Sequence, residues 1–285
     1  MSLSTVFGII GGDERQIYLA KSIRDDGYSV LISSLETADA SCEFENFSLD
    51  ELSKRCTDFI LPLPITRDGK ILNAPFSEKK VFLDDSFARL FSFGNIYGGI
   101  ADKLYQTSRQ WKNNNLVDYY DCEELIFGNA MLTAEGAIAI AIKEFEGALC
   151  GSSCLVTGYG RIGKALCRML YSLGAKVDCV ARKNIDLLGI KNLGCTPLRY
   201  DEVLKSYDVI FNTVPNVVLK STSLSRQSKN TLIIELASSP GGVDRHTAEN
   251  MRIRIIDAQS LPGRFSPKAS GEFIKEAIYN IMEEK

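Results

Sequence analysis

The sequence has little histidine, and its nearest pair of cysteines is Cys150 and Cys154. His246 is the only histidine among 285 residues, and no Cys-x-x-Cys motif occurs. A zinc site needs Cys and His clustered at short spacing, so no metal site is predicted. We interpret His246 as a surface helix residue and the thiols as buried free cysteines of a reducing compartment. The eight cysteines are Cys42, Cys56, Cys122, Cys150, Cys154, Cys167, Cys179 and Cys195.

Other absences narrow the class of protein. The formal net charge is −3 at pH 7 and no block of Lys and Arg is present, so nucleic acid is not an expected partner. No run of about 18 apolar residues is found, so no membrane span is expected. The N-terminal MSLSTVFGIIGGDERQ lacks the basic start and cleavage site of a signal peptide. A hydrophobic fraction of 45% and a length of 285 residues fit about two globular domains.

Strand-like and helix-like segments alternate along the chain, which is typical of parallel sheets covered on both faces. Strands are expected at 5–10, 28–33, 57–61, 90–93, 116–119, 154–156, 175–181, 208–212, 232–235 and 253–256. Helices are expected at about 14–26, 48–55, 98–111, 129–147 and 267–282, and after the glycine loop at 158–163. The sequence therefore predicts an α/β protein with two Rossmann-like, doubly wound parallel-sheet domains and an interdomain cleft.

The domain boundaries follow from this pattern. We place an N-terminal substrate and catalytic domain at 1–125, a linking helix at 126–148 and an NAD(P)-binding Rossmann domain at 149–266. The linking helix is rich in Ala and Ile and lacks proline. By analogy with two-domain dehydrogenases, the final helix at 267–285 is expected to pack back onto the first domain, and the cleft to close about hinges near 125–131 and 260–264.

The segment GYGRIG at 158–163 follows an apolar run, and apolar residues then recur at helical spacing as far as Gly174. A dinucleotide-binding Gly-x-Gly-x-x-Gly motif requires this strand–loop–helix setting. Gly158 would form the tight turn, Gly160 would let the backbone approach a pyrophosphate, and Gly163 would let helix and strand pack closely. The predicted dinucleotide-binding residues of this loop are Gly158, Tyr159, Gly160, Arg161, Ile162 and Gly163.

The position that selects between NAD and NADP carries cations. In an NAD site, an acidic residue commonly stands about 20 positions further on, at the end of the second strand. That place reads Ala181-Arg182-Lys183, and Asp178 lies earlier, within the strand. A guanidinium can pair with a 2′-phosphate in bidentate fashion. The sequence therefore favours NADP over NAD, with Arg182 and Lys183 as phosphate ligands.

Two later loops are also expected at the cofactor, because ligands of parallel sheets bind beyond the carboxyl ends of the strands. Residues 212–215 read NTVP after one strand, and residues 235–242 read ELASSPGG after the next. Small residues and glycines in the second loop permit close approach of a flat ring. The predicted cofactor-binding residues thus extend to Asn212, Thr213, Val214, Pro215, Ala237 and Ser238.

The loop after the first strand reads GGDERQ at 11–16. It precedes a helix whose N-terminus favours anions, but it lacks the Gly-x-Gly-x-x-Gly spacing. We interpret Gly12 and Arg15 as ligands of a substrate carboxylate, with an ordinary helix start as the alternative. Further candidates for the substrate lie at the start of the linking helix and at the entry to the last helix. They are Thr133, Glu135, Arg264 and Lys268.

Seven segments along the chain resemble those of one family. They are IIGGDERQ at 9–16, ILPLP at 60–64, NAMLTAEG at 129–136, GYGRIGKA at 158–165, NTVP at 212–215, ELASSPGGVD at 235–244 and LPGRFSPKASG at 261–271. In this order they resemble the family of dipicolinate synthase A subunits from spore-forming bacteria. GGDxRQ and the LPG…PK…G ending are specific to it, whereas the glycine loop alone is not.

The resemblance implies a two-domain nicotinamide dehydrogenase that acts with a flavoprotein-like B subunit. Together they would oxidise a dihydrodipicolinate-type product of the lysine pathway to dipicolinate while reducing NADP, in the mother-cell cytoplasm of a sporulating bacterium. Hydride transfer needs mainly orientation, and cations suit a dicarboxylate substrate. The catalytic set would be Asp13, Arg15, Glu135 and Lys268. The base is open among Asp13, Glu135 and Lys268, and a homo-oligomer is compatible with the sequence.

Two other functions stay open at this point. One is an NADP-dependent two-domain reductase or dehydrogenase of another small carboxylate. Such enzymes usually show a catalytic His with an Arg and an acid, and the position of His246 argues against it. The other is a non-catalytic, nucleotide-binding regulatory subunit of the synthase, in which a cofactor site and an anion loop would both persist.

Overall fold

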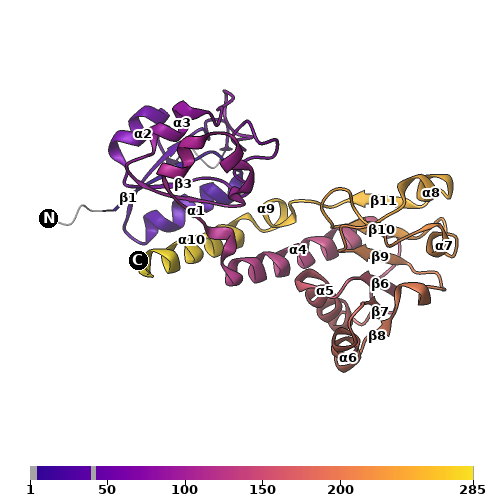
Figure 1. Ribbon diagram of the computed structural model, residues 1–285. Helices are drawn as coiled ribbons and strands as arrows, with labels where there is room; N and C mark the ends of the chain where they lie inside the picture. Colours follow the sequence, from indigo (N-terminus) through magenta and orange to yellow (C-terminus); the bar gives the residue numbers. More distant parts are fainter. Residues whose placement is uncertain (1–4, 40–42, 285) are drawn as a thin grey trace. The chain divides into compact units, whose positions relative to one another are not determined.

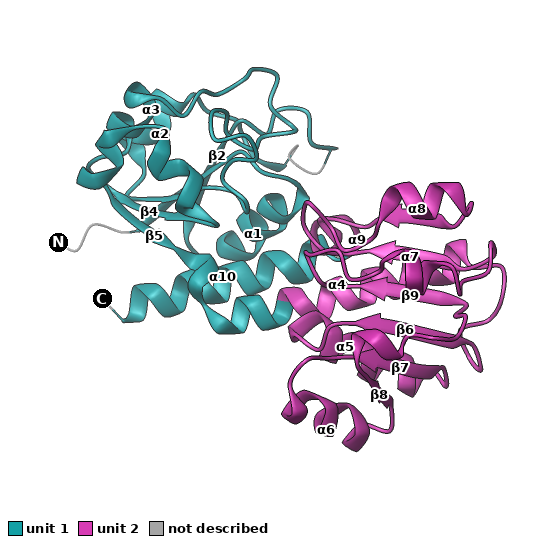
Figure 2. Ribbon diagram, turned by 45° about the vertical axis from the view of Figure 1, so that its right-hand side comes forward, with its two compact units in different colours: residues 1–128, 266–285 teal, residues 129–265 magenta. Residues whose placement is uncertain are grey.

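The chain divides into two compact units in the computed structural model, which describes residues 5–39 and 43–284 (Figures 1 and 2). Unit 1 comprises Met1–Gly128 and Ser266–Lys285, and unit 2 comprises Asn129–Phe265. Each unit contains one sheet of parallel strands. The expected α/β fold with two Rossmann-like parallel-sheet domains is therefore confirmed. Cys42 lies outside the described residues.

Unit 1 has five parallel strands in the order β2-β1-β3-β4-β5. They are β1 (Val6–Ile10), β2 (Ser29–Ser33), β3 (Asp58–Ile60), β4 (Asn95–Gly98) and β5 (Asn115–Asp118). Because β2 lies on one side of β1 and β3 on the other, the strand order reverses between β1 and β3. Ligands of open α/β sheets bind at such a switch point, beyond the carboxyl ends of the strands. The loops after β1 and β3 are therefore the place to seek a site in unit 1.

Apolar side chains pack on both faces of this sheet. Its helices are α1 (Glu14–Asp25), α2 (Leu49–Arg55), α3 (Asp85–Leu90) and α10 (Pro267–Glu283), with 3₁₀ helices η2 (Ala101–Gln106), η3 (Arg109–Asn113) and η4 (Tyr119–Asp121). Ile9 of β1 joins a core with Ile17 of α1 and with α10, whereas Ile10 joins a core with Leu52 of α2. Successive strand residues thus face α1 and α10 on one side and α2 and α3 on the other.

Two expectations in unit 1 were wrong. A strand is expected at 90–93, but Phe87 and Phe91 lie one helical turn apart and their ring centroids are 5.1 Å apart. The apolar run is therefore one face of α3 and its C-terminal end. A single helix is expected at 98–111, but η2 and η3 form instead, because Ser108 begins a new turn by accepting a hydrogen bond from the backbone of Gln110.

Unit 2 has six parallel strands in the order β11-β10-β9-β6-β7-β8. They are β6 (Ser153–Thr157), β7 (Lys176–Val180), β8 (Thr196–Leu198), β9 (Val209–Asn212), β10 (Leu232–Glu235) and β11 (Arg254–Asp257). This is the strand order of the dinucleotide-binding fold, with its switch point between β6 and β9. The sequence did not indicate β8, because this three-residue edge strand contains Pro197.

The helices of unit 2 precede or connect these strands. They are α4 (Glu123–Glu144), α5 (Arg161–Ser172), α6 (Asn184–Asn192), α7 (Ser221–Leu224), α8 (Arg245–Asn250) and α9 (Leu261–Phe265), with the 3₁₀ helix η5 (Tyr200–Glu202). The entry to the last helix is thus a separate short helix, α9, and α10 begins only at Pro267. His246 is an exposed residue of α8, as expected.

Helix α4 begins in unit 1 and continues into unit 2. By length and composition alone it is apolar enough to cross a membrane, although polar residues interrupt its apolar run. However, 61% of its most apolar window is buried within the structure. Ala134, Ala137 and Ala141 are fully buried in the core of unit 2. Its apolar character is therefore that of a core helix.

Most of the described thiols are buried, as the sequence suggested. Five of the seven described cysteines are buried, whereas Cys122 is half-buried and Cys150 is exposed. Burial raises the pKa of Cys56 and of Cys154 to about 11. These two thiols are therefore protonated at neutral pH and poor nucleophiles. The expectation of a buried thiol was wrong for Cys150.

Candidate cofactor and substrate sites

The glycine loop of unit 2 joins β6 to α5 and leaves the start of the helix uncovered. Gly158 has φ +91°, a left-handed conformation that side chains rarely adopt, and a β-carbon there would lie 2.8 Å from Oγ1 of Thr213. A β-carbon at Gly163 would collide with the carbonyl oxygen of Gly158. Gly160 is the N-cap of α5 without any side-chain hydrogen bond, and a β-carbon there would meet no atom within 4 Å.

This geometry fits the pyrophosphate of a dinucleotide. The first N–H groups of a 12-residue helix have no intrahelical acceptor, and the helix dipole favours an anion beside them. The exposed Gly160 lets an anion come close to these N–H groups. Tyr159 and Ile162 are half-buried beside the loop, and Arg161 is exposed at the first position of α5.

A buried polar network ties this loop to the loops after β9 and β10. Asn212 is fully buried at the end of β9, and its amide donates to Oε1 of Glu235 at 2.6 Å and to the carbonyl of Val214 at 3.0 Å. Its Oδ1 accepts a hydrogen bond from the hydroxyl of Thr157, the last residue of β6. Thr213 donates from its hydroxyl to the carbonyl of Thr157 at 2.8 Å. One network therefore sets the relative positions of three loops at the carboxyl edge of the sheet.

A cavity of about 520 Å³ opens at the carboxyl ends of β10 and β11. Glu235, Ala237, Arg245, Asp257 and Arg264 are among its lining residues. Ala237 is buried. Two other predicted cofactor residues are exposed, namely Ser238 on the loop after β10 and Pro215 on the loop after β9. The cavity thus lies in the half of unit 2 that follows the switch point.

Cations follow β7, where the cofactor ribose is expected. Arg182 and Lys183 are both exposed, and Lys183 is the N-cap of α6. The guanidinium of Arg199 donates to the carbonyl of Arg182 and to the side chain of Asn184, so it holds this turn in place. Asp178 is buried within β7, where Tyr207 and Lys205 contact its Oδ2 at 2.8 Å. The residues directly after β7 are therefore cationic, and the one carboxylate of this strand, Asp178, is buried and engaged elsewhere.

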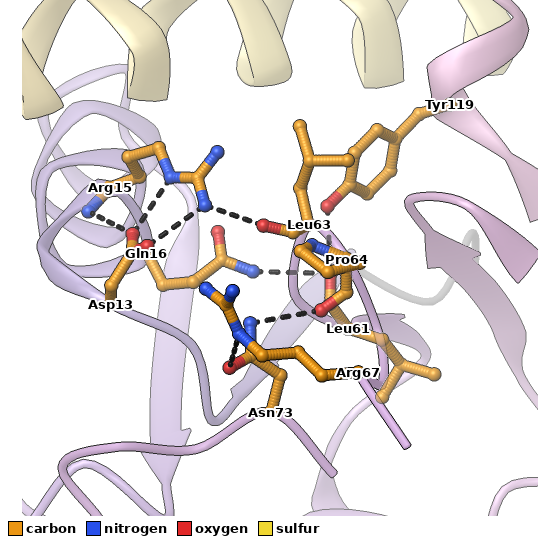
Figure 3. A network of polar contacts seen from close by, with 9 residues as sticks. All are labelled: Asp13, Arg15, Gln16, Leu61, Leu63, Pro64, Arg67, Asn73 and Tyr119. Carbon is orange, nitrogen blue, oxygen red and sulfur yellow. Dashed lines mark hydrogen bonds and ion pairs between the residues drawn. The ribbon is translucent and has the colours of Figure 1, made fainter. Parts of the chain in front are cut away.

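In unit 1, the loops after β1 and β3 meet at the switch point (Figure 3). Arg15 donates from Nε and Nη2 to the two carboxylate oxygens of Asp13, both at 2.8 Å, and from Nη2 also to the carbonyl of Leu63. Burial lowers the pKa of Arg15, but the hydrogen bond and charge of Asp13 outweigh it, so the pKa is raised overall. Arg15 is thus a buried cation fixed between the two loops.

Gln16 and Tyr119 complete the contacts to the loop after β3. Nε2 of Gln16 donates to the carbonyl of Leu61 at 3.1 Å, and the hydroxyl of Tyr119 donates to the same oxygen at 2.9 Å. Gly12 has φ +92°, and a β-carbon there would collide with the side chain of Gln16. The carbonyl of Asn73 accepts from the backbone N–H of Gly12 at 2.9 Å. The glycine loop of unit 1 is therefore closed by its own neighbours.

Lys268 lies at the same end of α1 as this loop. A β-carbon at Gly271 of α10 would lie 2.8 Å from the carbonyl oxygen of Arg15, and Lys275 pairs with Asp26 beyond the other end of α1. The two helices therefore run in the same direction. Lys268 precedes Gly271 by about one turn of α10, so this exposed residue lies near the N-terminal end of α1.

The remaining predicted substrate residues belong to unit 2. The Thr133 hydroxyl donates to the carbonyl of Asn129 in its own helix at 2.7 Å, and Glu135 is exposed on α4. Arg264 is exposed on α9, where its guanidinium carbon lies 5.7 Å from the ring centroid of Phe265. Unit 1 alone thus groups four of the candidates, namely Gly12, Asp13, Arg15 and Lys268.

Sequence reasoning missed three residues of these networks: Gln16, Arg199 and Glu235. Gln16 and Glu235 stood within quoted motifs, but only the fold shows that Gln16 is buried at the switch point of unit 1 and Glu235 at the carboxyl end of β10. A polar residue directly after a fully apolar strand, as Glu235 is after Leu232-Ile233-Ile234, is the signal that could have revealed it. Arg199 follows the edge strand β8, which carried no recognisable pattern.

Comparison with known proteins agrees with this architecture. Residues 6–120 match the family model of the N-terminal domain of the dipicolinate synthase A subunit, and residues 132–238 match that of the D-isomer specific 2-hydroxyacid dehydrogenase NAD binding domain. The dipicolinate synthase A subunit of Bacillus subtilis (strain 168) is 29% identical over 286 residues, which cover 97% of this chain and 95% of the relative. The chain is therefore similar to the dipicolinate synthase A subunits over nearly its whole length.

Solved structures of the family agree over the whole length. The A chain of dipicolinate synthase from Bacillus subtilis is 28% identical, with a TM-score of 0.84 over 100% of this chain and 97% of that one. The dipicolinate synthase A subunit from Bacillus halodurans is 27% identical, with a TM-score of 0.87 over 99% of each chain. The chain is an oxidoreductase of the nicotinamide-dependent dehydrogenase class. The uncovered N-terminus of α5 fits this cofactor.

Proposed function

We propose that the chain is the NADP-dependent subunit of a dipicolinate synthase, oxidising a dihydrodipicolinate-type intermediate to dipicolinate during sporulation. It would act with a flavoprotein-like B subunit in the mother-cell cytoplasm. The family relationship over 97% of the chain carries this proposal, because the relative is named as the A subunit of that enzyme. A nicotinamide cofactor supplies the hydride acceptor when bound.

The cations after β7 support NADP rather than NAD. Arg182 and Lys183 are exposed where an NAD site would place a carboxylate, and Asp178 is committed to Tyr207 and Lys205. The backbone of Arg182 is held by Arg199, so its side chain starts from a fixed turn. A 2′-phosphate would therefore meet two solvent-facing cations at this position.

The polar network of unit 1 supports a dicarboxylate substrate. Arg15 is fixed at the switch point, and Lys268 is exposed at the same end of α1. Lys268 has no acidic neighbour within the first turn of α10, so its ammonium group is suited to bind a carboxylate. The loop at Gly12 would shape the floor of this site. Arg264 is the corresponding candidate in unit 2, where it lines the cavity.

Three residues remain candidates for the base that removes the ring proton. Asp13 already accepts hydrogen bonds from the backbone and guanidinium of Arg15, which orient its carboxylate. Glu135 and Lys268 are exposed. Aromatisation of the ring makes the overall step downhill, so a weak base would suffice.

The reaction can be followed directly. Purified chain, by itself and with the B subunit, is mixed with freshly generated dihydrodipicolinate and NADP, and absorbance of the reduced nicotinamide is recorded. We expect reduction of NADP that requires the substrate. Signal only with the B subunit would mean shared catalysis, and no signal in either case would leave a regulatory role or another carboxylate substrate.

Two lysine variants test the substrate site. Lys268→Met should raise the KM for dihydrodipicolinate by about tenfold, the effect of one lost charge-assisted contact, and leave NADP affinity unchanged. Lys112→Met is the matched control, because Lys112 is exposed on η3, which packs with Phe87 on the other face of the sheet. Equal KM values for the two variants would exclude Lys268 from the site.

The cofactor preference has its own test. Arg182→Ala should weaken NADP binding by about tenfold or more and leave NAD binding within about twofold, because only NADP carries the 2′-phosphate. Lys191→Ala, an exposed change at the end of α6, is the control and should alter neither affinity. Wild-type protein that binds NAD and NADP equally would refute the preference.

A further inference from the structure

Glu235 is a carboxylate buried at the carboxyl end of β10. It is 1% exposed, and its oxygens accept from the amide of Asn212 at 2.6 Å, from the backbone N–H of Ala237 at 3.0 Å and from that of Gly242 at 2.9 Å. All three partners are donors, so the contacts are those of an ionised carboxylate. None of them is charged. Unit 2 therefore holds a negative charge that is hydrogen-bonded but not directly paired with a cation.

The place of Glu235 in the sheet relates this charge to one end of the cofactor. A dinucleotide-binding sheet consists of two halves, each binding one nucleotide. The half β6-β7-β8 carries the phosphate loop and Arg182, so it takes the adenosine nucleotide. The half β9-β10-β11 remains for the nicotinamide nucleotide. Glu235 ends the central strand of that half and lines the cavity at its carboxyl edge.

The other charges around this cavity face solvent. Arg245 at the start of α8 pairs with Asp257 at the end of β11, and these side chains are 46% and 56% exposed. Arg264 on α9 is exposed as well. The pKa of Arg245 is raised first by its hydrogen bond with Asp257 and also by the charge of Glu235. Solvent screens the exposed groups more strongly than the buried one, so the charge of Glu235 acts on this cavity with less screening than theirs.

We propose that Glu235 makes this site bind the oxidised nicotinamide more tightly than the reduced one. The oxidised ring carries a positive charge and the reduced ring is neutral, so a buried carboxylate discriminates between them by charge alone. The proposal rests on binding of a nicotinamide cofactor to unit 2. It does not depend on the substrate or on the 2′-phosphate, because both NAD and NADP change the ring charge in the same way.

This selectivity suits an enzyme that oxidises its substrate. Such an enzyme must capture the oxidised cofactor and release the reduced one at each turnover, and Glu235 favours both steps. The same preference makes hydride uptake by the bound cofactor less favourable. In the proposed reaction, formation of an aromatic ring offsets this loss.

The alternative is that Glu235 only anchors the loop after β10. A hydrogen-bonding anchor affects both oxidation states of the cofactor alike, whereas a charge affects their ratio. Dissociation constants of NADP⁺ and NADPH, and separately of NAD⁺ and NADH, are therefore measured by calorimetry on the whole chain without substrate. In Glu235→Gln, the ratio of the reduced-form to the oxidised-form constant should fall by about tenfold in both pairs, the effect of one partly screened charge.

Two further variants separate charge from geometry. Thr157→Val removes a hydrogen bond to Asn212 in the same network without changing charge, so both constants should shift together and their ratio should stay within about twofold. Arg245→Gln removes a cation beside the cavity, so the ratio should rise, by about twofold because Arg245 is solvent-exposed.

The outcomes decide between the two roles. An unchanged ratio in folded Glu235→Gln, judged by a wild-type circular dichroism spectrum, overturns the proposal. If Glu235→Gln does not fold, the wild-type protein decides, and wild-type constants that do not favour the oxidised form in both pairs overturn the proposal. Either result leaves the assignment as an NADP-dependent dipicolinate synthase intact, because no substrate is present and NAD and NADP are compared separately.

Discussion

Both units contain a strand, a glycine loop and a 12-residue helix, but they leave the start of that helix in opposite states. In unit 1, Asp13 is the N-cap of α1 and accepts from the backbone and guanidinium of Arg15. In unit 2, Gly160 is the N-cap of α5 and has no side chain to accept anything. Their backbones are alike, with φ −101° and ψ −166° at Asp13 and φ −76° and ψ −166° at Gly160.

The difference shows that the same local fold can bind or exclude a phosphate. At α5 the first N–H groups stay available to an anion, as in dinucleotide sites. At α1 the carboxylate of Asp13 already occupies that position and compensates the helix dipole. An anion in unit 1 must therefore be held by cationic side chains, which makes Lys268 a more direct candidate than the helix N-terminus itself.

The largest effect on stability and cofactor binding is expected at Gly163, where the glycine loop of unit 2 has no space for a β-carbon. In Gly163→Ala, the added carbon collides with the carbonyl of Gly158, so the loop must move. We expect a loss of about 3 kcal/mol in the free energy of unfolding, at the upper end for overpacking, together with loss of cofactor binding. Urea unfolding and calorimetry measure both.

The control for this variant lies in the same loop. Gly160→Ala adds the same carbon where no atom lies within 4 Å and φ is −76°, so the free energy of unfolding should fall by no more than about 1 kcal/mol, the difference between Gly and Ala as an N-cap. If both alanine variants were equally destabilised, helix propensity and not the contact with Gly158 would explain why position 163 requires glycine.

The second test gives unit 2 the cap of unit 1. Gly160→Asp places a carboxylate in backbone geometry close to that of Asp13, so it should cap α5 and leave the fold at least as stable. The same charge should repel a pyrophosphate and weaken cofactor binding by about 100-fold. Calorimetric titration with NADP measures this affinity, and Gly160→Ala distinguishes charge from size. Retained affinity in Gly160→Asp would contradict the open-helix interpretation.

The third test opens unit 1 instead. Asp13→Gly removes the cap of α1 and the acidic partner of Arg15, which leaves a buried cation paired only with the Leu63 carbonyl. We expect a loss of about 2 kcal/mol in the free energy of unfolding, less than for a fully buried pair because Asp13 is 24% exposed. Asp13→Asn keeps a capping oxygen and should lose about half as much. Urea unfolding that finds Asp13→Gly as stable as wild type would remove the closed-loop interpretation.

The smallest effect is expected at the other end of α1. Lys275 pairs with Asp26 at 2.8 Å, and this hydrogen bond lowers the pKa of Asp26 below its usual value. A carboxyl with a lowered folded-state pKa stabilises the fold above its unfolded pKa, and this contribution is lost as the pH falls through the folded value. Asp26→Asn should therefore cost about 0.5 kcal/mol at pH 7, since the pair is solvent-screened, and nothing at a pH low enough to protonate wild-type Asp26. Urea unfolding at both pH values tests this, and a pH-independent difference would assign the effect to packing.

Local patterns were enough to predict most strands and the glycine loop between β6 and α5. The strand expected at 232–235 matches β10, and the helix expected at 48–55 matches α2, which Ser48 caps with Glu51 in a capping box. These features depend on residues a few positions apart, whose spacing is visible in the sequence. The strand expected at 90–93 failed because the period of a short apolar run cannot distinguish a strand from a helix end.

The candidate sites also contain features that the sequence indicated and features that it could not indicate. The sequence indicated GGDERQ, the loop at 158–163 and the cations at 182–183, because each is a contiguous group of residues with a known chemistry. It could not indicate that Arg15 donates to Leu63 across 48 positions, or that Asn212 and Glu235 share a hydrogen bond across 23. Such pairs form only when neighbouring strands bring their carboxyl ends together.

The sequence by itself determined the fold class, the resemblance to a family and the position of the glycine loop, because these depend on local spacing and on motifs. Only the tertiary structure decided which helix start is open, since Asp13 and Gly160 differ by what surrounds them as well as by side chain. It also decided that Glu235 is buried and surrounded by N–H donors. Burial and electrostatics depend on contacts between distant segments, and these exist only once the sheets have formed.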